Sequence, residues 1–264
     1  MQNDTSPFLS PSDTRWAQSI VGTFLYYARA LDCTLVTALN DISRQQAQPT
    51  ENVRKKCQQI LDYVATYPNA YTRYHSSNMI LNIDSDAAYL VLPQAKSRIA
   101  GYFYLSDHYT NASSPSINGP ILVECKTLRH VVASAAEAEV SAIFHNAQTA
   151  IPIRNLLESL GHPQPPTPIK TDNTTANGFV HSNINQKRSK SWDMRFHWLK
   201  DKTTQKYINV YWKKGSENDA DYFTKHHRTS YHRAMRPRYV LDLLKEKIHN
   251  IFSVGYPTVT LPNT

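Results

Sequence analysis

The N-terminal part of the chain carries apolar residues at helical spacing. Between residues 15 and 47 they recur every three or four positions, which predicts mostly helical structure with one buried face (Ile20, Phe24, Leu25, Ala28, Leu31). Thr50 suits the N-cap of a second helix that ends at Pro68, with its own apolar side (Val53, Cys57, Ile60, Leu61, Val64). We therefore expect a helical segment over residues 15–70, after a disordered polar leader over residues 1–14.

After Tyr71 the apolar period changes from helical to alternating. The stretches 72–75, 79–84, 98–105 and 120–128 lie between turn residues, which predicts consecutive antiparallel strands. A long helix should run from Ser134 to about Leu160, because Ser134 and Glu137 form a capping box, and Pro152 should kink or divide it. The remaining pattern predicts a strand at 169–172, helices near 173–180 and 190–200, a strand at 206–212, a terminal helix beginning within 217–226, and a C-terminal helix and tail over 241–264.

The positive charge of the chain is concentrated in one segment. The 264 residues have a net charge of +8, and residues 181–240 hold 14 Lys/Arg against 5 Asp/Glu, a net +9. Aromatic residues are interleaved there, and cationic plus aromatic side chains suit phosphate contacts and base stacking. The candidate nucleic-acid contacts are Lys187, Arg188, Lys190, Arg195, Lys213 and Lys214. A solvated surface over core aromatics is the alternative interpretation.

Several classes of protein are excluded by what the sequence lacks. No apolar run approaches the roughly 20 residues of a membrane helix, and the polar N-terminus is unlike a secretory signal. Cys33, Cys57 and Cys125 are widely spaced and form no CxxC pair, which argues against a disulfide framework or a zinc site. We expect a soluble intracellular protein with no membrane partner.

Four carboxylates stand at strand ends and helix starts. They are Asp84, Glu139, Asp172 and Asp221. Acids at such places can converge on one edge of a sheet, where divalent cations would neutralise them and support phosphoryl transfer with two metal ions. Each acid also has a simpler interpretation: Asp84 or Asp86 as a turn residue, Asp172 as a helix cap, and Asp221 as a partner of a helix dipole. Glu137 should face its own helix N-terminus as part of the capping box, which leaves Glu139 as the functional acid.

The four acidic motifs resemble a known family when they are taken in order. IDSDAAY, AEAEV, KTDNTTA and NDADYFTK are similar to the ribonuclease H domain of copia-type retrotransposon polyproteins, and residues 15–70 resemble the connection that precedes it. The resemblance implies an α/β fold with a mixed five-stranded sheet flanked by helices, behind a small helical segment. It covers roughly residues 15–240, within which 71–240 would form the ribonuclease H-like domain.

The resemblance also implies an activity, which is hydrolysis of the RNA strand of RNA–DNA hybrids. Asp84, Glu139, Asp172 and Asp221 would hold two Mg²⁺ ions, or Mn²⁺, within about 8 Å of one another. The choice between Asp84 and Asp86 stays open, because Ala87-Ala88-Tyr89 replaces the usual Trp-Ala-Gly. No Tyr-x-Asp-Asp polymerase motif is present, so a reverse transcriptase polymerase domain would be a separate partner. The alternatives are an inactive nucleic-acid-binding or structural remnant and another nuclease of the same superfold, such as an integrase.

Overall fold

The N-terminal segment is a group of packed helices. The structure, a computed structural model, describes residues 4–107, 115–181 and 190–243. The group consists of α1 (Pro11–Ala30), the 3-10 turn η1 (Cys33–Leu35), α2 (Val36–Ser43) and α3 (Glu51–Thr66). Ser10 and Thr50 cap α1 and α3, as side-chain acceptors of backbone N–H groups. The predicted helical segment is therefore present.

The expected disordered leader is corrected by the structure. Helix α1 already begins at Pro11, and the residues before it run beside the start of α3. The Leu9 N–H donates to the Pro49 carbonyl at 2.8 Å, and the Glu51 N–H donates to the Pro7 carbonyl at 2.9 Å. These backbone hydrogen bonds explain why a polar, proline-containing stretch takes a definite path.

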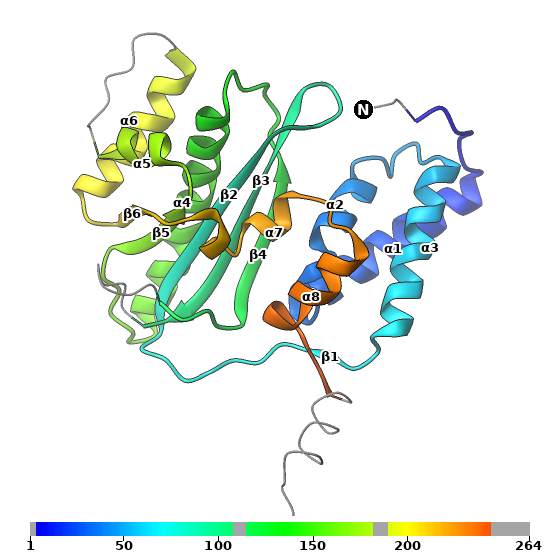
Figure 1. The fold of residues 1–264 in the computed structure, drawn as a ribbon, viewed down its shortest axis with the longest axis horizontal. Helices are drawn as coiled ribbons and strands as arrows, with labels where there is room; N and C mark the ends of the chain where they lie inside the picture. The colour runs from blue at the N-terminus through cyan, green and yellow to red at the C-terminus, as the bar shows by residue number, and fades with distance from the viewer. Residues whose placement is uncertain (1–3, 108–114, 182–189, 244–264) are drawn as a thin grey trace, which may run out of the picture.

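A mixed five-stranded sheet forms the centre of the molecule (Figure 1). Its strands are β2 (Ile80–Leu92), β3 (Lys96–Ser106), β4 (Pro120–Thr127), β5 (Thr167–Thr171) and β6 (Ile208–Trp212), in the order β4-β3-β2-β5-β6. The pairs β2–β3 and β3–β4 are antiparallel, whereas β2–β5 and β5–β6 are parallel. The predicted fold class is confirmed.

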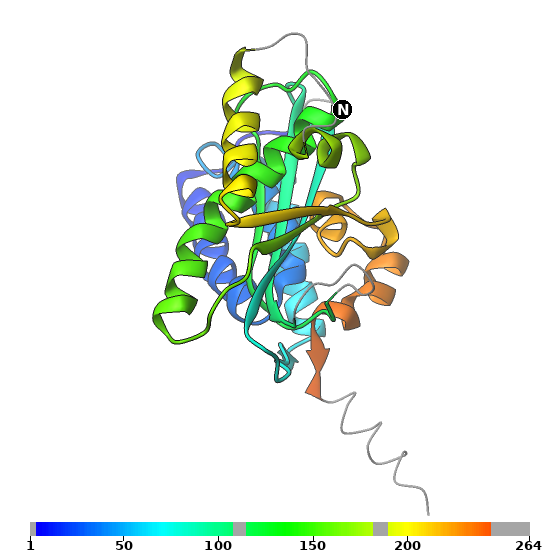
Figure 2. The ribbon, with the colours of Figure 1, turned by 90° about the vertical axis from the view of Figure 1, so that its left-hand side faces the viewer.

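Helices cover both faces of this sheet. On one face lie α4 (Ala135–Ser159), α5 (Thr174–Val180) and α6 (Lys190–Thr204), and on the other lie the N-terminal helices (Figures 1 and 2). After β6 the chain forms the 3-10 turn η2 (Gly215–Glu217), α7 (Asp221–Thr224) and α8 (Thr229–Tyr239) on the second face. The short strand β1 (Ala70–Tyr71), which follows α3, pairs antiparallel with β7 (Leu241–Asp242), which follows α8.

Two apolar cores correspond to the two faces. Ile83 and Phe103 pack with α4, α5 and α6, whereas Tyr102 and Tyr104 pack with the N-terminal helices and with Phe223 of α7. Because neighbouring strand residues point to opposite faces, β3 contributes to both cores. The helical segment is thus packed against the sheet. No helix of the described residues is long and apolar enough to cross a membrane.

Three details of the predicted elements are wrong. Residues 72–75 form no strand, because the Asn118 side chain bonds both the N–H and the carbonyl of His75, at 2.8 and 2.9 Å. The strand predicted to end at Asp84 continues to Leu92. Of the two outcomes expected at Pro152, a kink or a division of the helix, division does not occur, since Pro152 lies on the exposed side, where water can bond the carbonyl left free in the preceding turn. Of the expected C-terminal helix and tail, residues 244–264 lie outside the described chain.

Candidate active site

Three carboxylates meet where β2 and β5 separate. In the parallel pairing, Ile83 lies opposite Ile169 and Asp84 opposite Lys170. Two residues further along each strand, the same register brings Asp86 level with Asp172. Glu139, in the second turn of α4, completes the group, and one ligand oxygen of each of the three acids lies within 4.8 Å of the others.

Two acids of this group, Asp86 and Glu139, accept hydrogen bonds from neighbouring polar groups. The Asp86 Oδ2 atom accepts a hydrogen bond from the Thr224 hydroxyl at 2.6 Å. The Glu139 Oε1 atom accepts from the Ala87 N–H at 3.2 Å, and its Oε2 atom accepts from the Thr171 hydroxyl at 3.4 Å. The group is therefore assembled from β2, β5, α4 and α7, which are far apart in the sequence.

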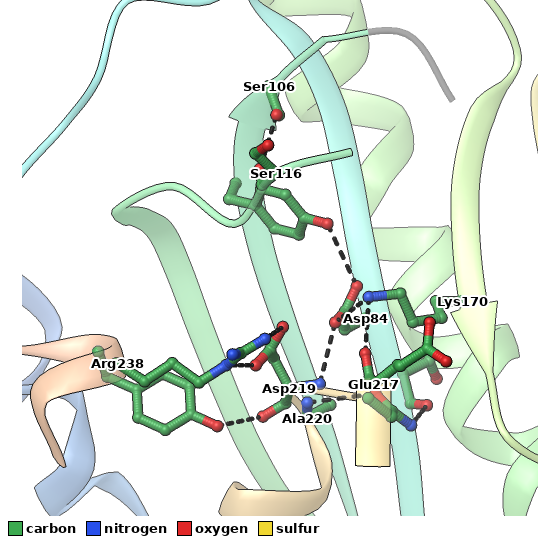
Figure 3. Close-up of polar contacts among 12 residues, drawn as sticks. Asp84, Ser106, Ser116, Lys170, Glu217, Asp219, Ala220 and Arg238 are labelled. Atoms are coloured by element: carbon green, nitrogen blue, oxygen red, sulfur yellow. Dashed lines mark hydrogen bonds and ion pairs between the residues drawn. The ribbon is translucent and has the colours of Figure 1, made fainter. Parts of the chain in front are cut away.

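Of the two acids that the sequence left open, Asp86 belongs to the three-acid group and Asp84 does not. Its side chain is fully buried, and its Oδ2 atom lies 2.8 Å from the Lys170 Nζ atom. The same oxygen accepts from the Asp219 N–H at 3.0 Å, and the Tyr104 hydroxyl donates to Oδ1 at 3.4 Å (Figure 3). Lys170 also donates to the Glu217 carbonyl at 2.9 Å. Asp84 and Lys170 thus anchor the turn that leads to α7.

Asp221 begins α7 beside the three-acid group. Its carboxylate forms an ion pair with Lys225, one turn later in the chain. The charge of Asp221 raises the pKa values of both Asp86 and Asp172. It is not among the three acids whose oxygens share the 4.8 Å range. The structure therefore brings Asp221 near the three-acid group, with its carboxylate paired to Lys225.

Burial and neighbouring carboxylates raise the pKa values of all three acids. Burial, then the charges of Asp221 and Asp172, raise the pKa of Asp86 to about 7. Burial and the neighbouring acids also raise the pKa of Glu139 well above its ordinary value, and that of Asp172 is raised by burial and by Asp221. Crowded carboxylates of this kind are stable when ionised only with a cation among them. Three carboxylate oxygens at this spacing are a donor set that fits Mg²⁺ or Mn²⁺.

Gly215 lies close to the Asp172 carboxylate. A Cβ atom added to Gly215 would lie 2.8 Å from the Asp172 Oδ2 atom. The Trp212 indole N–H donates to the Asp172 carbonyl at 2.9 Å, so both ends of the β6–η2 connection contact this residue. The sequence analysis did not select Gly215, Thr224 or Lys225, and only their place in the fold reveals their contacts with the acids.

Glu137 behaves as the capping box predicts. Its N–H donates to the Ser134 hydroxyl at 3.1 Å, and its Oε2 atom accepts from the Ala133 N–H at 2.7 Å. The carboxylate therefore turns back toward the start of its own helix, and the expectation is confirmed.

The expected basic contacts are distributed unevenly. Lys213 and Lys214 directly follow β6 and lead into Gly215, close to Asp172. Arg195, in α6, donates to the His130 Nε2 atom at 2.7 Å and to the Ser141 hydroxyl at 3.4 Å, beside Glu139 on α4. Lys187 and Arg188 lie outside the described residues, as does the Lys190 side chain.

Comparison with known proteins gives one relative that is similar to this chain in sequence. No family model matches the chain. The Retrovirus-related Pol polyprotein from transposon TNT 1-94 of Nicotiana tabacum is 24% identical over 233 residues, which is 87% of this chain and 16% of the polyprotein. The chain therefore corresponds to a small part of that relative's length.

Solved structures with weak likeness include two bacterial or environmental domains and one viral domain. The N-terminal ribonuclease H domain of a Mycobacterium tuberculosis protein has a TM-score of 0.39 at 12% identity, covering 55% of this chain and 91% of that one. LC11-RNase H1, solved with an RNA/DNA hybrid, has a TM-score of 0.37 at 9% identity, with coverages of 53% and 91%. The ribonuclease H domain of prototype foamy virus has a TM-score of 0.35 at 13% identity, with coverages of 62% and 92%.

All three TM-scores are below 0.5, so the class of fold rests on this chain's own strands. Three antiparallel strands followed by two parallel ones, in the order β4-β3-β2-β5-β6 with helices on both faces, define a ribonuclease H-like fold. The chain is also similar in sequence, over most of its length, to a part of a retrotransposon Pol polyprotein.

Proposed function

We propose that this chain is a Mg²⁺-dependent endonuclease of the copia-type ribonuclease H kind, which hydrolyses the RNA strand of RNA–DNA hybrids. The observation that carries the proposal is the group of Asp86, Glu139 and Asp172, whose ligand oxygens lie within 4.8 Å of one another at the end of β5. Burial and the neighbouring acids raise the pKa values of Asp86 and Glu139, and a bound cation would stabilise their ionised forms.

Asp86, Glu139 and Asp172 would hold the metal ions, and Asp221 would join them when it leaves Lys225. Two Mg²⁺ ions, or Mn²⁺, would supply the charge that activates a water for in-line attack and stabilises the leaving oxygen. Thr224 orients the Asp86 carboxylate through its hydroxyl, and the Ala87 N–H orients Glu139. Lys225, freed from Asp221, would lie beside the scissile phosphate as a counter-charge.

Lys213 and Lys214 follow β6 and lead into Gly215 beside Asp172, and Arg195 of α6 bonds Ser141 of α4. These three residues would contact a phosphate backbone there. Lys187, Arg188 and Lys190 stay predicted contacts from the sequence. Phosphate contacts make affinity fall with salt, by a slope of about −0.7 to −0.9 per phosphate neutralised. Selectivity for the RNA strand would come from its 2′-hydroxyls, which a protein can contact across the wide, shallow groove of a hybrid.

The test uses one labelled RNA sequence in three settings: annealed to DNA, single-stranded, and as a DNA–DNA duplex of the same sequence. The proposal expects cleavage of the hybrid alone, dependent on Mg²⁺ or Mn²⁺ and abolished by EDTA. Hybrid binding without cleavage in either metal would instead favour the inactive remnant. Cleavage of duplex DNA would favour an integrase-like nuclease.

A further inference from the structure

A cavity of about 580 Å³ lies between the helical segment and the C-terminal helices. Helices α2 and α3 line one side, and α7, α8 and the residues between them line the other; Figure 1 shows these helices on the same face of the sheet. Its volume falls within the range of about 300–1,000 Å³ that small-molecule sites occupy. None of Asp86, Glu139 and Asp172 lines it, so it is distinct from the candidate active site.

The walls of the cavity are aliphatic and aromatic. Leu35 and Ile60 contribute aliphatic surface, and Tyr63 and Tyr222 contribute rings. The Tyr222 ring stacks on the His227 ring, with centroids 4.7 Å apart and planes at 19°, and the Tyr63 ring lies 5.3 Å from that of His232. Flat rings and aliphatic surface together suit a flat heteroaromatic ligand such as a nucleobase.

The polar groups of the lining favour an anion. Asp41 is the only carboxylate among the lining residues, and it is already paired with both Arg98 and His226. Lys56 brings positive charge to one side of the cavity, and Lys225, which is paired with Asp221, lines the other side. His232 adds an unpaired ring nitrogen: its Nδ1 atom bonds the Tyr222 hydroxyl, whereas its buried Nε2 atom has no hydrogen-bond partner among the described residues.

We propose that this cavity binds a phosphorylated nucleotide, with the base among the aromatic residues and the phosphate near Lys56 and the Nε2 atom of His232. The ligand is either a free nucleotide or the phosphorylated end of a nucleic-acid strand, because both present the same chemistry. The inference does not depend on the metal-ion chemistry of the acid group, because it places the phosphate at Lys56 and His232, and neither residue belongs to that group.

Isothermal titration of the full-length, metal-free protein tests the proposal. AMP should bind saturably, whereas adenosine and inorganic phosphate alone should each bind at least about tenfold more weakly, because each lacks half of the recognised groups. A short RNA with a 5′-phosphate, compared with its unphosphorylated form, distinguishes a strand end from a free nucleotide. If only AMP binds, the ligand is a free nucleotide; if the phosphorylated RNA competes with AMP, it is a strand end.

Matched variants assign the binding to this cavity. Lys56→Glu should weaken AMP binding about tenfold or more, and Lys55→Glu, an exposed neighbour on α3 outside the lining, should leave it unchanged. His232→Asn keeps a polar atom for the Tyr222 hydroxyl, removes the unpaired nitrogen, and should also weaken binding. Absence of saturable binding by either AMP or the phosphorylated RNA, or equal loss in both lysine variants, would overturn the proposal. Because no metal or cleavage enters this titration, its result is independent of the proposed nuclease activity.

Discussion

At the scale of single residues, Asp84 and Asp86 lie on one strand but have different surroundings and different effects on stability. They lie two positions apart and therefore on the same face of β2, separated by roughly 7 Å. Asp84 is neutralised by Lys170 inside the fold, whereas Asp86 faces two further carboxylates. One acid therefore holds the fold together, and the other is destabilising until a cation binds.

Asparagine substitutions should separate these two effects. Without metal, Asp84→Asn should lower the free energy of unfolding by about 3 kcal/mol, because Lys170 would stay buried without its partner. Asp86→Asn should leave the stability equal or higher, because it removes like-charge repulsion. Urea unfolding in EDTA measures both values. Equal destabilisation by the two substitutions would mean that Asp86 is also a structural acid.

Gly215 gives a steric test of the acid group. Gly215→Ala should displace the Asp172 carboxylate and weaken Mg²⁺ binding, because the added Cβ atom would lie 2.8 Å from the Oδ2 atom. Gly22→Ala is the control, since nothing lies within 4 Å of its Cβ position in α1. The control should stabilise the protein by about 0.5–1 kcal/mol and leave Mg²⁺ binding unchanged. Unchanged Mg²⁺ affinity in Gly215→Ala, measured by titration calorimetry, would remove Asp172 from the metal site.

The raised pKa of Asp86 also makes stability depend on pH. Its pKa is about 7 in the folded chain and near 3.8 ordinarily, so the folded state binds more protons between these values. The free energy of unfolding of the metal-free protein should therefore fall as the pH rises from about 4 to 7. Asp86→Asn should flatten this slope, and saturating Mg²⁺ should oppose it by binding the ionised form. Unfolding curves across this pH range check the sign; a rising stability that Asp86→Asn leaves unaltered contradicts it.

At the scale of elements, the register of β2 against β5 assembles the group. The sequence reflects this register. Ile83 and Ile169 pair, and an acid follows each of them three residues later, Asp86 on β2 and Asp172 after β5. Strands and helices could be predicted from periodicity, because the spacing of apolar residues reflects local geometry. The pairing of strands distant in sequence could not, so Asp84, at the end of the shorter predicted strand, was an equally reasonable choice.

Arg98 of β3 joins the helical segment to α7 behind the site. It is almost fully buried, pairs with Asp41 of α2, and donates to the Thr224 carbonyl at 3.1 Å. Thr224 in turn donates to Asp86. This chain of contacts links a helix of the N-terminal segment to an acid of the site, and no pattern in the sequence indicates it.

Removing Arg98 should therefore be costly. Arg98→Ala should lower the free energy of unfolding by about 3–5 kcal/mol, because it removes the buried partner of Asp41 and leaves the Thr224 carbonyl without this donor. Arg44→Ala is the matched control, since Arg44 pairs with the same Asp41 at 3.9 Å from a more exposed position and should change stability by less than about 1 kcal/mol. Urea unfolding distinguishes the two; similar midpoints for both variants would show that the Arg98 contacts contribute little.

At the scale of the whole molecule, the helical segment and the sheet share one apolar core. Tyr102 and Phe223 stack with ring centroids 5.8 Å apart, and the cluster that contains them also includes α1, α2 and α3. The sequence predicted the helical segment and the strand-rich part, but it did not indicate which face of the sheet the helices cover. That depends on which side of β3 each aromatic residue occupies, and therefore on strand pairing. The acids of the site thus sit between two packed layers.

The central claim is that Asp86, with Glu139 and Asp172, holds metal ions that cleave an RNA–DNA hybrid. The most direct measurement is the cleavage rate of a labelled hybrid in saturating Mg²⁺ by the natural chain and by Asp172→Asn, with hybrid affinity measured in parallel in EDTA. The account predicts unchanged affinity and a rate reduced by orders of magnitude, because the asparagine keeps the side-chain size and loses a metal ligand. An Asp172→Asn protein that cleaves the hybrid at the original rate would contradict it.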